Sequence, residues 1–134
     1  MEGIVIDTNV FVAARFNPRS ASARILTGIR EGRFRLMWNE PTRRETEIIV
    51  RRIPRLDWAS IADLFQPEAE FAGPVDLEAF TAISDPDDRK LAALSAAVNV
   101  PLITNDGRVL AEGGAVGIEA LTPRAFLERK GASG

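Results

Sequence analysis

Short apolar runs alternate along the chain with longer segments in which apolar residues recur every three or four positions. The apolar runs predict buried strands at 3–7, 34–38, 101–104 and 118–121. The periodic segments predict helices at 9–16, 21–30, 41–52, 57–64, 86–98, 108–112 and 123–129. Segment 66–84 is less regular and indicates at most a short strand at 70–72 and a helical turn at 76–80. Strands that alternate with helices predict an α/β sandwich with a mainly parallel sheet.

The length of 134 residues fits one domain, which we expect over residues 1–130 with a flexible tail at 131–134. No apolar run approaches the about 18 residues of a membrane span. The N-terminus lacks a basic segment followed by an apolar, signal-type stretch. We therefore expect a cytoplasmic protein without a membrane association.

Composition narrows the chemistry, because the chain contains no Cys, no His and no Tyr. Disulfides, thiolate zinc sites, cysteine nucleophiles and histidine bases are thereby excluded. An enzyme built from this set can use carboxylates, with or without a hard metal ion, or hydroxyls and arginines. The net charge of −2 does not by itself indicate nucleic-acid binding.

Two predicted strands end at or just before an aspartate. Asp7 follows Ile4–Ile6, and Asp106 follows the strand at 101–104. Ligands of open parallel sheets bind beyond the carboxyl ends of the strands, so both side chains are site candidates. The alternative is that each carboxylate caps the helix that follows it.

Three aspartates stand at the start of the helix at 86–98, where the helix dipole favours acidic side chains. Asp88 shares a face with Leu91, which turns it inward. Asp87 points toward Lys90 and reads as a solvated ion pair, and Asp85 reads as the N-cap. Asp88 is therefore the site candidate of this group.

The helix at 41–52 carries two glutamates on different faces. Glu45 lies on the same face as Ile48 and Ile49, which are expected to be buried. Glu47 has Arg43 four residues before it and Arg51 four residues after it, an exposed charge ladder. Glu45 is therefore the carboxylate that we expect to face the interior.

Four acids from different elements could converge, namely Asp7, Glu45, Asp88 and Asp106. Carboxylates that share a pocket repel one another, and a divalent cation would neutralise them. Oxygen ligands without His or Cys favour Mg²⁺ or Mn²⁺ over zinc. Such a site suits phosphodiester hydrolysis.

These segments resemble motifs of the PIN-domain family of metal-dependent ribonucleases, and within it the VapC-like toxins of bacterial toxin–antitoxin pairs. The matching segments are Ile6–Val10 with its Asp-Thr-Asn, Asn39–Glu45, Asp85–Leu94, Leu102–Asp106 and Thr122–Leu127. Asn39 stands where Ser is more usual in the family, and Asn105 where Gly is common.

The resemblance implies a metal-dependent endoribonuclease toxin with Mg²⁺ or Mn²⁺ as cofactor and RNA as substrate. Its catalytic and metal-binding acids would be Asp7, Glu45, Asp88 and Asp106, held in place by Thr8, Asn9 and Thr104. It further implies a three-layer, Rossmann-related sandwich with a five-stranded parallel sheet, frequent homodimers, and a cognate antitoxin that obstructs the site.

The basic residues on and after the helix at 41–52 allow two interpretations. Arg43, Arg44 and Arg55 could contact RNA phosphates beside the acids, or they could serve solubility and the Glu47 ladder. Trp38 and Trp58 could stack on bases, but buried aromatics are commoner, and we expect core or interface positions for both.

Two further function classes remain open. A phosphatase with Asp7 as nucleophile usually has a second Asp two residues later, where this chain has Asn9. A non-catalytic binder, either a degenerate PIN domain or a receiver-like acidic pocket, is the other alternative. Degenerate members typically lose an acid, whereas all four are present here, and neither Lys90 nor Lys130 is placed as a receiver requires.

Overall fold

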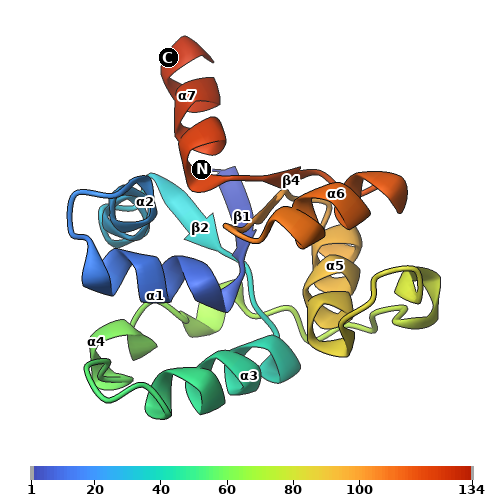
Figure 1. The fold of residues 1–134 in the computed structure, drawn as a ribbon, viewed down its shortest axis with the longest axis horizontal. Coiled ribbons are helices and arrows are strands. Elements are labelled where there is room, and N and C mark those ends of the chain that lie inside the picture. Colours follow the sequence, from blue (N-terminus) through green and yellow to red (C-terminus); the bar gives the residue numbers. More distant parts are fainter. Residues whose placement is uncertain (1, 134) are drawn as a thin grey trace.

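A four-stranded parallel sheet lies at the centre of the fold in the computed structural model, which describes residues 2–133 (Figure 1). The strands stand in the order β2-β1-β3-β4. Their bounds are Glu2–Ile6 for β1, Phe34–Leu36 for β2, Leu102–Ile103 for β3 and Ala120–Leu121 for β4. All three pairings are parallel, as the sequence predicts.

Helices connect the strands within residues 2–133. They are α1 (Thr8–Phe16), α2 (Ala21–Arg30), α3 (Glu40–Arg51), α4 (Ala59–Ala62), α5 (Pro86–Val98), α6 (Gly107–Ala115) and α7 (Pro123–Ser133), with short 3₁₀ turns η1 (Pro67–Ala69) and η2 (Glu78–Phe80). None of the helices in this part of the chain has the length and apolar character needed to cross a bilayer.

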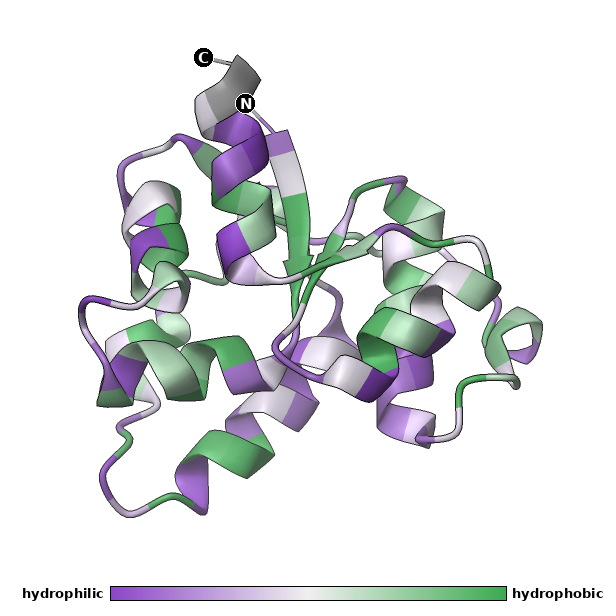
Figure 2. Cartoon of the chain, turned by 45° about the horizontal axis from the view of Figure 1, so that its top comes forward, coloured by the Kyte–Doolittle hydropathy of each residue, from purple (hydrophilic) through white to green (hydrophobic). Residues whose placement is uncertain are grey.

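Alternation along the strands divides the core into two halves. Ile4, Ile6 and Ile103 pack on one face of the sheet with apolar residues of α1, α2, α3, α4 and α7. Val5 and Leu102 pack on the other face with α5 and α6. Figures 1 and 2 show helices on both sides of the sheet and hydrophobic residues along the central strands. The predicted three-layer sandwich is confirmed.

The expectation of five strands is wrong for the described residues. The fifth strand is reduced to one isolated parallel bridge between Trp38 and Glu70. The Phe71 amide donates to the Trp38 carbonyl at 2.7 Å, and the Trp38 amide reaches the Ala69 carbonyl at 3.4 Å. Helix α3 begins at Glu40, two residues after Trp38, so the segment around Trp38 is too short to extend the ladder. Pairing therefore stops after one bridge.

The sequence also placed the end of α6 too early, at Gly113. The helix continues to Ala115, and Gly117 at φ 84° ends it with the left-handed conformation that glycine tolerates. A Cβ on Gly113 would lie 3.2 Å from the Ala120 Cβ and from Ile118 Cγ1. The glycine therefore allows close packing of α6 against β4.

Helix α7 is longer than the sequence indicated. It was expected to end at Arg129 before a tail at 131–134, but its helical backbone continues to Ser133. Gly134 lies outside the described residues. Phe126 anchors the helix, since it is fully buried and meets the Phe34 ring edge-on with the centroids 5.0 Å apart.

Both tryptophans pack against the core. Trp38 is only 7% exposed, and its indole N–H donates to the Gln66 carbonyl at 2.8 Å. Trp58 is half-buried. The Phe65 ring lies between them, with centroid distances of 5.9 Å to Trp38 and 5.5 Å to Trp58. The preference for core positions over base stacking is therefore supported.

Candidate active site

Asp7 lies where the direction of the chain through the sheet reverses. From β1 the chain passes through α1 and α2 to β2 on one side, and β3 joins β1 on the other side. Ile6 pairs with Ile103, so Asp7 and Thr104 directly follow paired residues of neighbouring strands. Crevices at such switch points are the usual ligand sites of open parallel sheets.

The Asp7 side chain does not cap α1, although Asp7 occupies the N-cap position. Its Oδ2 instead accepts hydrogen bonds from the Thr104 hydroxyl at 2.8 Å and from the Asn9 amide nitrogen at 3.2 Å. The carboxyl is only 8% exposed. Burial raises its pKa, the Thr104 hydrogen bond opposes this, and the nearby charge of Asp106 raises the pKa further. By hydrogen-bond geometry Asp7 is therefore not a capping residue, although the nearby backbone amides of Thr8 and Asn9 also lower its pKa.

Asp106, in contrast, does cap its helix. Its Oδ1 accepts from the Arg108 amide at 2.9 Å at the start of α6. Its own amide donates to the Thr104 hydroxyl at 3.0 Å, so Thr104 links the two aspartates. The capping interpretation is confirmed for Asp106, and its carboxylate also lies close enough for its charge to raise the pKa of Asp7.

Among the candidate acids, Asp88 has the largest shift in pKa. Partial burial raises its pKa to about 7, together with the charges of Asp7, Asp85, Asp106 and Asp87 in decreasing order. The inward orientation predicted from the helical face agrees with this. Asp85 is the N-cap of α5, as predicted, since its side chain accepts from the Asp87 amide at 2.9 Å.

Glu45 faces a neighbour that the sequence did not indicate. Burial raises the pKa of Glu45, and the charge of Asp87 raises it further, while Lys90 and Arg52 lower it. Asp87 makes the predicted ion pair with Lys90, with Nζ 3.2 Å from Oδ1. Glu45 on α3 and Asp87 on α5 are thus two carboxylates beside one lysine, and Asp87 is more than a solvated partner of Lys90.

A cavity of about 110 Å³ between α3 and α5, here called the carboxylate cavity, brings most of these acids together. Asp7, Glu45, Asp85, Asp87 and Asp88 line it. Asp106 is not among its lining residues. Within residues 2–133, no three carboxylates are arranged so that all could bind one metal ion. The donor chemistry nevertheless fits a hard divalent cation, because these groups are all carboxylate oxygens.

Hydrogen bonds of buried polar residues fix the elements around this cavity. The hydroxyls of Thr8 and Thr46 lie 2.8 Å apart and tie the start of α1 to α3. Asn39 and Thr42 form a reciprocal capping box at the start of α3. Asn39 can replace the family's usual Ser because both are good N-caps. Thr46 was missed, although its spacing of four residues from Thr42 was a visible signal.

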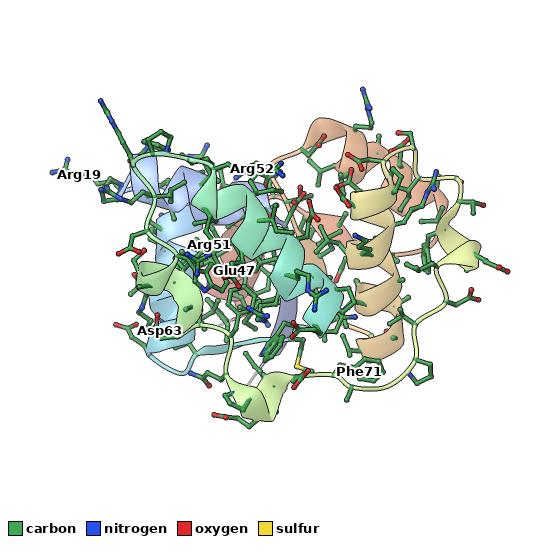
Figure 3. The ribbon with its side chains drawn as sticks, turned by 90° about the horizontal axis from the view of Figure 1, so that it is seen from below. Arg19, Glu47, Arg51, Arg52, Asp63 and Phe71 are labelled. Carbon is green, nitrogen blue, oxygen red and sulfur yellow. The ribbon has the colours of Figure 1, made fainter. Side chains whose placement is uncertain are left out.

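Most arginines of α3 form ion pairs with glutamates of the same helix. Arg43 contacts Glu40 at 2.7 Å and Glu47 at 2.8 Å, and Arg51 contacts Glu47 at 2.7 Å. Figure 3 shows Glu47 and Arg51 side by side on this helix. The predicted ladder is confirmed.

Arg44 and Arg55 are less constrained than Arg43. Arg44 is 3.6 Å from Glu40 and largely exposed, and Arg55 is exposed as well. Of the three arginines considered for RNA, Arg43 is therefore the least available to phosphate.

The arrangement defines a class of protein, a three-layer α/β sandwich with buried and partly buried carboxylates at its switch point. The sequence profile of the PIN domain matches residues 3–107, a range that includes all four candidate acids. The chain belongs to the PIN-domain family. PIN domains are generally nucleases and usually use divalent metal ions. A search of curated proteins found no match to the sequence.

Proposed function

We propose that the protein is a metal-dependent endoribonuclease and the toxin of a bacterial toxin–antitoxin pair. The observation that carries the proposal is Asp7, a buried acid at the switch point that is withheld from capping. Its charge and that of Asp106 both raise the pKa of Asp88, so these three acids are electrostatic neighbours. Clustered acids of this kind favour a site for a divalent cation.

The residues proposed to hold Mg²⁺ or Mn²⁺ are Asp7, Glu45, Asp88 and Asp106. When bound, such an ion supplies Lewis-acid chemistry for the hydrolysis of a phosphodiester.

The chain's own groups position these acids. Thr104 and Asn9 hold Asp7 by converging on Oδ2. Thr8 and Thr46 keep α3, and with it Glu45, against the start of α1. Burial and the charges of the neighbouring acids raise the pKa of the Asp88 carboxyl to about 7, which favours its protonated form in the absence of a cation.

The test is cleavage of a single-stranded RNA with Mn²⁺, with Mg²⁺ and with chelator. We expect cleavage with either ion, none with chelator, and products with 5′-phosphate and 3′-hydroxyl ends. Asp7→Asn should abolish cleavage. Asp63→Asn, which removes an exposed carboxylate, should not. Products with a 2′,3′-cyclic phosphate would contradict the proposal, because they require attack by the 2′-hydroxyl.

The toxin role has its own test. Expression of the chain alone should arrest growth, and the product of a short neighbouring gene should relieve the arrest and copurify with the protein. The resemblance also leads us to propose a homodimer, which sedimentation would detect. Growth that is unaffected by expression of a protein that cleaves RNA in vitro would leave the nuclease proposal intact and reject the toxin role.

One observation favours a second candidate, a non-catalytic PIN-like RNA-binding protein. Glu45 faces Asp87 and Lys90, and the described residues offer no group of three carboxylates for one ion. RNA that is bound but not cut with either ion would establish this alternative.

A further inference from the structure

We propose that one nucleotide of single-stranded RNA binds in an apolar cavity beside Asp7, and that Arg19, Arg24 and Arg124 bind the phosphates that follow it. This inference rests on the proposed function and deepens it, because it assigns the path by which the substrate leaves the carboxylates. Three cavities with shared walls define the path.

The apolar cavity has a volume of about 620 Å³. Small apolar side chains line much of it, among them Val12, Ala13, Ile49 and Pro123. It shares Ile49 and Asp7 with the carboxylate cavity, so the two are contiguous. Its volume lies within the range of about 300–1,000 Å³ that is typical of small-molecule sites.

The apolar cavity also adjoins a basic hollow, here called the arginine cavity. This hollow of about 430 Å³ is lined by Arg19, Arg24 and Arg124, with Glu128 as its acidic residue. The apolar and arginine cavities share Ala21 and Arg124. The order of the three cavities is therefore acids, apolar walls and arginines.

The arginines of this cavity are available to an anion. The guanidinium groups of Arg19 and Arg24 make no hydrogen bond or ion pair with the described residues, and the one side-chain hydrogen bond at Arg19 uses its backbone amide. Figure 3 shows the Arg19 side chain extending outward at the edge of the molecule. Arg124 lies 3.5 Å from Glu128, but their side chains are 84% and 72% exposed. Such exposed pairs are weak and exchange easily for a phosphate.

A nucleotide fits the sequence of chemistries along this path. A nucleobase and its ribose present a flat, weakly polar surface to the apolar walls. The phosphate on one side of the nucleotide would reach the cation held by the acids, and the phosphate on the other side would reach the arginines. A single strand is required, because the bases of a duplex are stacked and paired. An acidic peptide would match the arginines but not the combination of a base-sized cavity and a phosphodiester site.

The polar groups at the edge of the apolar cavity are largely committed within the protein. The Ser20 hydroxyl caps α2 by accepting from the Ala23 amide, and Asn9 uses its nitrogen on Asp7 and its oxygen on the Asn105 amide. Few groups remain to read the edge of a base. The cavity therefore selects by shape, and we expect it to impose little base preference.

Binding of a fluorescent single-stranded RNA in chelator tests the arginines without requiring cleavage. The double variant Arg19→Gln/Arg24→Gln should lower affinity about tenfold at low salt. The slope of log affinity against log salt should become shallower by about 1.4, since each lost phosphate contact of a single strand contributes about 0.7. The matched control is Arg33→Gln/Arg35→Gln, which removes two charges near the amino-terminal end of β2. It should change neither quantity.

A variant that fills the apolar cavity tests the nucleotide itself. Ala13→Leu should lower affinity several-fold and leave the salt slope unchanged, because it blocks the base and not the phosphates. A melting curve checks that each variant is folded.

The outcomes separate this inference from the proposed function. Wild-type protein that cuts no RNA, with binding that still depends on Arg19 and Arg24, supports the path and rejects the nuclease. Cleavage by the wild type with unchanged binding in the arginine variant or in Ala13→Leu overturns the path alone. Equally tight binding of an acidic peptide, lost in the same arginine variant, would also overturn it, because the surface would then serve a protein ligand.

Discussion

Replacement of Asp88 by Asn is expected to stabilise the cation-free protein above neutral pH. Asp88 shares its surroundings with Asp7, Asp85 and Asp106, whose charges add to the effect of partial burial. The folded protein therefore resists ionisation of Asp88, whose pKa is raised to about 7 from the ordinary value of 3.8 for an aspartate. Asparagine keeps the shape of the side chain and removes the charge.

The sign follows from proton linkage. Because the folded state binds the Asp88 proton more tightly than the unfolded state, the contribution of this group to stability is complete below about pH 3.8. It is lost as the pH rises through about 7. A shift of this size corresponds to about 4 kcal/mol before screening. Since the carboxyl is partly exposed, solvent screening reduces the expected effect to about 1–2 kcal/mol.

Thermal unfolding in chelator at pH 4 to 8 measures this difference. Asp88→Asn should lose less stability than the wild type over this range and melt roughly 4–8 °C higher at pH 8, at about 4 °C per kcal/mol for a domain of this length. The control Asp63→Asn removes an exposed carboxylate and should follow the wild type.

Addition of Mn²⁺ tests whether Asp88 belongs to the proposed ion site. A cation that binds only the folded state adds about 2.7 kcal/mol at 100 times its dissociation constant. Mn²⁺ should therefore raise the melting temperature of the wild type more than that of Asp88→Asn. Identical pH profiles of the two proteins would refute the electrostatic reasoning, and identical Mn²⁺ shifts would remove Asp88 from the ion site.

Substitutions at four further positions test the helix α3 and its N-cap. Glu45→Gln should abolish RNA cleavage, whereas Glu47→Gln should leave it nearly unchanged; equal losses of activity would contradict the assignment of the two faces. Thr46→Val should cost about 1–3 kcal/mol in urea unfolding, because it leaves the buried Thr8 hydroxyl without its partner, while Thr46→Ser retains most of the stability. Asn39→Ala should cost about 1 kcal/mol through loss of the N-cap, and Asn39→Ser should cost little; similar stability of the two Asn39 variants would show that the cap is unimportant.

The sequence predicted the elements well where hydrophobic periodicity is strong. The strand before Asp7 and the helix at 86–98 are examples, because the spacing of their apolar residues along the sequence indicates which face is buried. The prediction failed where the structure of a segment depends on contacts with residues that are distant in the sequence. The segment at 70–72 has the composition of a strand, yet it forms only one bridge because few residues on either side can pair.

The sequence indicated the individual candidate residues of the site, but it did not indicate how they lie relative to one another. Helical spacing correctly turned Asp88 inward. It was wrong for Ile48, which was expected on a buried face beside Glu45 but is 40% exposed, and the Glu47 side chain in the ladder is only 26% exposed. It could not reveal that Glu45 faces Asp87 and Lys90, because that juxtaposition depends on how α3 packs against the first turn of α5. No local pattern encodes the distance between two helices whose acids are more than forty positions apart in the sequence.

Asp7 and Asp106 show how a long-range contact can decide the role of a side chain. Each aspartate stands between a strand and a helix, so local rules assign both to capping. The structure withholds Asp7 from that role, because the Thr104 hydroxyl, 97 positions away in the sequence, binds its carboxylate from the neighbouring strand. Asp106 meets no such competitor for Oδ1 among the described residues and caps α6. Loss of the hydroxyl in Thr104→Val should therefore free Asp7 to rotate toward the start of α1, whereas Thr104→Ser should hold it in place.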